Sequence, residues 1–264
     1  MNLWKTLAAS LGLLAVVGAA QAGPITGQGT WESTLKARDI HGKAVALGDA
    51  STAFFYDTAL NITWLADMNH AKTSGHDADG IMDWSSSVAW GNSLTIGSFS
   101  GWRLPTMVDT GTAGCNFSYD GGSDCGFNVQ TKDGSTVYSE MAHLYYTTLG
   151  NLAPCAPGGN TPYSCEGQSG WDPTNTALFQ NMQSYGYYWS GLEYAPNQDY
   201  AWYFSTDGGS QSGTVKYDAM YAVAVRPGDV LQDAGNQVPE PQGLVLALTA
   251  LAGLGVALRR RRAA

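Results

Sequence analysis

The chain has 264 residues, of which 13% are charged, and a formal net charge of −9. Five of the 13 Lys and Arg residues lie near the ends of the chain, namely Lys5 and four C-terminal arginines. The segment from Gly23 to Leu258 therefore holds eight Lys and Arg and all 22 Asp and Glu, which gives it a net charge of −14. This balance argues against nucleic-acid binding, since phosphate contacts need Lys and Arg. It suits a soluble extracellular domain, with attraction of cations as a further possibility.

The first 22 residues have the pattern of a secretory signal peptide. Lys5 precedes an apolar run over residues 7–20, and Ala20 and Ala22 form a small-x-small cleavage site. The sequence therefore predicts cleavage before Gly23 and export. The alternative is an uncleaved membrane anchor, but the apolar run is short for a membrane span.

The body reads as strands, then two helices, then more strands. Residues 23–52 are predicted to be an N-terminal extension or the first strands, and residues 53–230 a domain. The predicted strands are Ala53–Tyr56, Ile62–Leu65, Tyr187–Ser190, Ala201–Phe204, Thr214–Tyr217 and Tyr221–Arg226. Asp83 is expected to cap a helix that continues to about Leu94, and Ser139 one that continues to Leu149.

Four cysteines, Cys115, Cys125, Cys155 and Cys165, lie in the exported body, where disulfides persist. Three pairings are possible. The equal ten-residue separations favour Cys115–Cys125 and Cys155–Cys165, each closing a Gly-, Asn- and Ser-rich surface loop. A zinc site is the rival interpretation, but there is no CxxC pair to favour it.

Catalytic motifs are absent from the sequence. It has no GxSxG, HExxH, P-loop or GxGxxG pattern. Asp77, Asp79 and Asp83 form an oxygen-rich set near two histidines that would favour calcium if a metal binds, although their spacing does not match an EF-hand. No other cofactor is expected.

Aromatic residues crowd the stretch from Tyr185 to Tyr221. Aromatic rings can stack on sugars while polar neighbours bind the hydroxyl groups. Trp189 and Trp202, in predicted strands, are expected in the core. Tyr194 and Tyr200, in the intervening loop, are the surface candidates.

Four short runs occur in order along the body: Gly101–Thr106 (GWRLPT), Tyr188–Gly191 (YWSG), Ala201–Phe204 (AWYF) and Ala224–Pro227 (AVRP). Together they resemble a bacterial extracytoplasmic domain family related to the C-terminal domain of collagen-like adhesins and, more distantly, to C-type lectins. The resemblance implies an α+β, C-type-lectin-like domain with two helices, a mainly antiparallel sheet and long disulfide-stapled loops. Arg103 in the first run is expected to form a structural ion pair or carbonyl contacts.

The loop that begins at Glu193 resembles the Glu-Pro-Asn sugar loop of C-type lectins, with Asn197 at its end. It departs from that motif because two residues separate Glu193 from Pro196, and the Trp-Asn-Asp calcium triplet is absent. The expected ligand-binding residues are Glu193, Tyr194, Asn197 and Tyr200.

The C-terminal end has three parts in order. After a linker over residues 231–237, Val238, Pro239, Glu240 and Pro241 precede sixteen uncharged residues, and Arg259, Arg260, Arg261 and Arg262 follow them. Residues 238–264 resemble the PEP-CTERM sorting signal, which implies a transmembrane helix and processing by an exosortase in bacteria that secrete exopolysaccharide. By the positive-inside rule the arginines stay cytoplasmic and the body lies outside the inner membrane. A permanent tail anchor is the alternative.

These observations predict a non-enzymatic cell-surface or extracellular-matrix protein that binds polysaccharide or another surface component. An extracytoplasmic enzyme that acts on polysaccharide is the first alternative, with Asp199 paired with Glu193 or Asp207. A purely structural matrix protein is the second.

Overall fold

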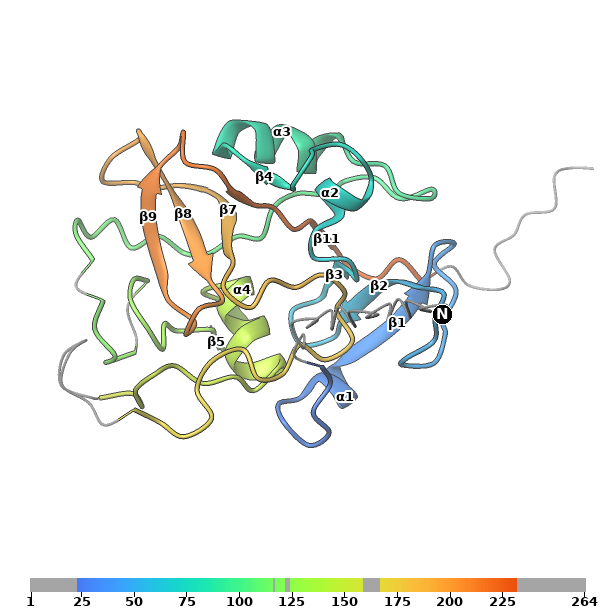
Figure 1. The fold of residues 1–264 in the computed structure, drawn as a ribbon, viewed down its shortest axis with the longest axis horizontal. Helices are drawn as coiled ribbons and strands as arrows, with labels where there is room; N and C mark the ends of the chain where they lie inside the picture. Colours follow the sequence, from blue (N-terminus) through green and yellow to red (C-terminus); the bar gives the residue numbers. More distant parts are fainter. Residues whose placement is uncertain (1–22, 116, 122–123, 159–166, 232–264) are drawn as a thin grey trace, which may run out of the picture.

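The computed structural model describes residues 23–115, 117–121, 124–158 and 167–231. In chain order its elements are α1 (Trp31–Thr34), β1 (Leu35–Asp39), β2 (Thr52–Asp57), β3 (Ile62–Leu65), α2 (His70–Thr73), β4 (Ile81–Met82), α3 (Trp84–Ser93), β5 (Lys132–Asp133), β6 (Thr136–Val137), α4 (Glu140–Ala142), the π-helix η1 (His143–Thr148), β7 (Tyr187–Glu193), β8 (Tyr200–Ser205), β9 (Gln211–Val215), β10 (Met220–Tyr221) and β11 (Val225–Pro227). The fold is therefore α+β and mostly sheet. In Figure 1, β7, β8 and β9 stand on one side, β1, β2 and β3 on the other, and α3 runs across the top.

The first sheet has the strand order β1-β2-β3-β11, and all its pairs are antiparallel. β2 and β3 confirm the two predicted strands. Between them, Asp57 Oδ1 accepts a hydrogen bond from the Ala59 amide (2.9 Å), and Asn61 takes a positive φ of 55°, which asparagine tolerates. Because β1 pairs with β2, the segment 23–52 supplies a strand of this sheet and is not an appended extension.

The second sheet has the order β4-β10-β7-β8-β9, in which only the β10–β7 pair is parallel. Trp189 and Trp202 are completely buried, as predicted. The indole N–H groups of these two side chains both have partners: Trp189 donates to the Met82 carbonyl (2.9 Å) and Trp202 to the Asp109 carboxylate (2.7 Å). The aromatic strands thus form core on both faces of this sheet.

Both predicted helix caps are present. Asp83 accepts from the Ser86 amide (2.8 Å) at the start of α3, and Ser139 accepts from the Ala142 amide (3.1 Å) at the start of α4. The second helix differs from its prediction, because only α4 is α-helical and η1 continues it as a π-helix. The Leu149 amide bonds to the Leu144 carbonyl, five residues back, which is the π-helical spacing.

The GWRLPT run joins the two sheets. The Arg103 backbone pairs with Val225 of β11 in the first sheet, and the Pro105 carbonyl accepts from the Gly191 amide of β7 in the second. The Arg103 guanidinium holds the buried Glu140 carboxylate of α4 with two hydrogen bonds of 2.7 and 2.8 Å. The predicted structural role of Arg103 is confirmed, and Glu140 raises the pKa of Arg103 further.

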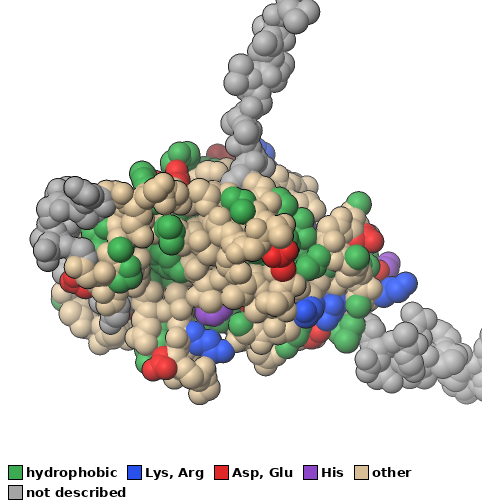
Figure 2. All heavy atoms as spheres, turned by 90° about the horizontal axis from the view of Figure 1, so that it is seen from below, with side chains coloured by type: hydrophobic (Ala, Val, Ile, Leu, Met, Phe, Trp, Pro, Cys, Tyr) green, Lys and Arg blue, Asp and Glu red, His purple; other side chains and the backbone are tan. Residues whose placement is uncertain are grey.

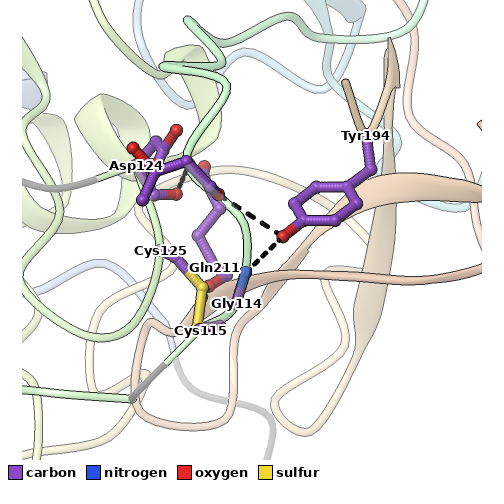
Figure 3. Close-up of a disulfide and its surroundings, with 7 residues drawn as sticks. Gly114, Cys115, Asp124, Cys125, Tyr194 and Gln211 are labelled. Carbon is purple, nitrogen blue, oxygen red and sulfur yellow. Dashed lines mark hydrogen bonds between the residues drawn. A yellow bond between two sulfur atoms is a disulfide. The ribbon is translucent and has the colours of Figure 1, made fainter. Parts of the chain in front are cut away.

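The Cys115–Cys125 disulfide is present, with Cα atoms 5.6 Å apart (Figure 3). Its loop is docked on the second sheet, whereas the sequence predicted a surface excursion. Cys125 is buried beside Met107 and Trp202, and the Gln211 side chain donates to a carbonyl of the loop. Cys155 is also disulfide-bonded, while its expected partner Cys165 lies outside the described residues.

The predicted signal peptide (1–22), most of the linker and the sorting tail (238–264) lie outside the described residues. The part of the chain that the structure does describe contains no helix long and apolar enough to cross a membrane. On the face seen in Figure 2, acidic and basic side chains are scattered among mostly uncharged groups.

Candidate functional site

An open cleft of about 760 Å³ lies where the start of α3, the β7–β8 loop and the end of β9 meet. The lining residues are Asp83, Ser85, Asn197, Gln198, Asp199, Tyr200, Val215, Lys216 and Tyr217. They supply amide, carboxylate, hydroxyl and ammonium groups beside two tyrosine rings. The structure thus brings together Asn197 and Tyr200, predicted as ligand contacts, with Asp83, predicted as a metal ligand.

The β7–β8 loop is held in one conformation by short-range hydrogen bonds. The Tyr194 amide bonds to the Tyr200 carbonyl (3.0 Å), closing the hairpin. Within the loop, the Tyr200 amide bonds to the Asn197 carbonyl, and the Asp199 amide to Asn197 Oδ1, both at 3.0 Å. The loop residues that line the cleft are therefore preorganised, which lowers the entropy cost of binding a ligand.

Lys216 supplies the cation of the cleft wall. Its ammonium pairs with the Glu193 carboxylate and lies 4.7 Å from the centre of the Trp84 ring, a cation–π contact. The Trp84 indole donates to the Ser190 carbonyl (2.8 Å), which fixes the ring. Glu193 is a residue of β7 that positions and neutralises Lys216, and it is not among the lining residues.

Asp83 forms an acidic edge of the cleft. Hydrogen bonds from the Ser86 amide and the Ser85 hydroxyl favour its charged form and lower its pKa. The carboxylate is thus ionised at neutral pH while it caps α3. A polar ligand in the cleft meets this fixed negative charge.

The expected metal set is not assembled. Asp77 accepts from the Asp79 and Gly80 amides, and Asp79 accepts from the Ile81 amide, so these carboxylates stabilise their own turn. Asp83 caps a helix instead. Among the described residues, no three His, Cys, Asp or Glu side chains are grouped so that they could hold a metal ion.

Tyr194 has a structural role, in contrast to its predicted role as a ligand contact. It is half-buried against Trp202, with ring centres 5.0 Å apart, and its hydroxyl accepts from the Gly114 amide (2.8 Å). Figure 3 shows the ring reaching from the β7–β8 loop toward the disulfide loop. Asp109 adds a second link through the Ala195 amide (2.7 Å). Tyr194 therefore supports the β7–β8 loop through its contacts with Trp202 and the disulfide loop.

The carboxylates considered for catalysis are differently placed. Asp199 directly precedes Tyr200 at one end of β8, whereas Asp207 follows Ser205 at the other end. Five strand steps, about 17 Å, separate these ends, so Asp199 and Asp207 lie farther apart than the paired carboxylates of glycosidases. Asp199 lines the cleft, but Glu193 is occupied by Lys216.

The sequence interpretation missed five residues that line the cleft, namely Ser85, Gln198, Val215, Lys216 and Tyr217. Thr214–Tyr217 was predicted as strand, but β9 ends at Val215, and the chain then turns. The turn leaves Tyr217 81% exposed. Asp218 is a residue type that favours turns, and it is the signal that could have indicated this change of direction.

Comparisons of the chain with protein-family models, curated proteins and solved structures found no match.

Proposed function

We propose that this chain is an exported cell-surface or exopolysaccharide-matrix protein whose body binds polysaccharide without catalysing a reaction. The cleft beside the β7–β8 loop carries this proposal. Its amide and carboxylate groups suit the hydroxyl groups of sugars, and the rings of Tyr200 and Tyr217 offer faces for the C–H surfaces of a pyranose. The loop is held in place before any ligand arrives.

The fold supports a C-type-lectin-like assignment. The resemblance implied two helices, a mainly antiparallel sheet and disulfide-stapled loops, and the structure contains α3, the α4–η1 helix, two such sheets and the docked disulfide loop. The family that the chain resembles is extracytoplasmic, which agrees with the signal-peptide pattern and with disulfide formation.

The ends of the chain support the route to the surface. We propose that the signal peptide directs export, that the tail holds the body outside the inner membrane, and that an exosortase-type enzyme releases it. Replacement of Pro239-Glu240-Pro241 by alanines is expected to leave the protein in the membrane fraction at its unprocessed mass. Normal release of this variant would contradict the sorting proposal.

A glycan array with the purified protein tests the binding function. Asn197→Ala and Lys216→Met are expected to weaken binding because both side chains line the cleft. Lys36→Met is the matched control, because Lys36 is exposed on β1 in the other sheet. Binding to no polysaccharide would overturn the proposal. Release of shorter products, lost on Asp199→Asn, would replace it with the enzymatic alternative.

A further inference from the structure

A row of polar and aromatic side chains continues from the cleft across one face of the second sheet. Side chains alternate along a strand, so Tyr203 of β8 shares a face with Ala201 and Ser205. Tyr187 of β7, which lies opposite Ser205 of β8, is 45% exposed, and its ring centre lies 5.5 Å from that of Tyr203 in an edge-to-face arrangement. Tyr203 is half-buried against the core on this face, so Tyr187 is the more exposed ring of the pair.

The tyrosine pair connects with the cleft through the turn after β9. Thr214, opposite Ala201, donates to the Asp218 carboxylate (2.6 Å). Burial raises the pKa of the Tyr203 phenol, and the nearby Asp218 carboxylate adds to this shift. Lys216 and Tyr217 of the cleft directly precede Asp218, so the turn after β9 carries residues of both the cleft and this surface.

We name this surface the sheet strip and define it by Thr214, Asp218, Tyr203 and Tyr187. From Ala201, opposite Thr214, to Ser205, opposite Tyr187, it extends four strand steps, about 13 Å. With the cleft at one end, the whole surface is longer than one sugar ring. Its shape therefore suits an extended chain better than a single terminal sugar.

The charge of the surface limits the class of chain. Asp83 and Asp199 line the cleft and Asp218 lies in the strip, whereas the cation Lys216 is already neutralised by Glu193. The chain as a whole carries a net charge of −9. A polysaccharide with carboxylate or sulfate groups would be repelled, and an uncharged one would not.

We propose that the sheet strip is a second subsite, so that the cleft and the strip together bind an internal stretch of an uncharged polysaccharide chain. This inference rests on the proposed polysaccharide-binding function. In it the cleft holds one sugar by hydrogen bonds, and the next sugars in the chain pack on Tyr203 and Tyr187. Affinity then depends on chain length.

Calorimetric titration with cello-, malto- and chito-oligosaccharides, each from the disaccharide to the hexasaccharide, tests this. For at least one series, affinity should rise with length. Tyr187→Ala should weaken hexasaccharide binding by about 3- to 10-fold and leave disaccharide binding unchanged. Tyr185→Ala is the matched control, because Tyr185 is a tyrosine 68% exposed that contacts Asp172, outside the strip.

The outcomes separate the two proposals. If oligosaccharides bind with equal affinity at every length, or if Tyr187→Ala and Tyr185→Ala behave alike, the second subsite is wrong and the cleft function stands. Oligogalacturonate binding as tightly as the uncharged series would also overturn the inference. If no saccharide binds, here or on the array, the proposed function itself fails.

Discussion

Removal of the Arg103 guanidinium should destabilise the protein more than removal of any exposed ion pair. The Glu140 carboxylate is only 6% exposed and accepts two hydrogen bonds from Arg103 and one from the Thr106 amide (2.8 Å). Arg103→Met leaves this carboxylate buried with one donor. Breaking a buried pair costs 3–5 kcal/mol, and because Arg103 is 32% exposed, the lower end, about 3 kcal/mol, is expected.

Urea denaturation measures this cost, and a double-mutant cycle with Glu140→Gln isolates the coupling between the two side chains. Lys216→Met is the control. The Lys216–Glu193 pair is 25% and 47% exposed, so its loss should cost at most about 1 kcal/mol. If Arg103→Met lowers the free energy of unfolding no more than Lys216→Met does, or if the double-mutant cycle shows no coupling, the inference that Arg103 and Glu140 stabilise the fold as a pair is wrong.

Three other perturbations probe parts of the structure distant from this pair. Burial and a nearby lysine lower the pKa of His143 from 6.5 to about 4. The free energy of unfolding should therefore fall by about 3 kcal/mol as the pH drops from above 6.5 to 4, because the unfolded chain binds the proton more readily. A His143→Gln variant that shows the same pH profile in urea denaturation would contradict this. Replacing Cys115 and Cys125 by serine should cost about 2–3 kcal/mol, and a calorimetric melting temperature equal to that of the parent would refute it. Gly209→Ala should destabilise the protein far more than Gly48→Ala. Both glycines have φ above +79°, but only at position 209 would a Cβ lie within 3 Å of two tyrosine side chains. Equal losses of unfolding free energy in the two variants would show that the tyrosines move aside at no cost.

The elements that depend on neighbouring residues could be predicted from the sequence. β2 and β3 follow from short runs of aromatic and β-branched residues on either side of a turn, and Asp83 and Ser139 cap helices because an N-cap needs only its own following turn. The ten-residue spacing of Cys115 and Cys125 likewise favours a local pairing. Burial of the strand tryptophans follows from their size and position. Each of these depends on short-range geometry.

Contacts between distant segments could be known only from the tertiary structure. The resemblance of the GWRLPT run indicated that Arg103 needs partners, but not that Glu140 is the one. Tyr194 reads as a loop tyrosine until the disulfide loop is seen to dock on it. The cleft joins the start of α3 to a turn more than a hundred residues later, at Lys216. Because such juxtapositions follow from the pairing of whole sheets, residue type and spacing alone do not specify them.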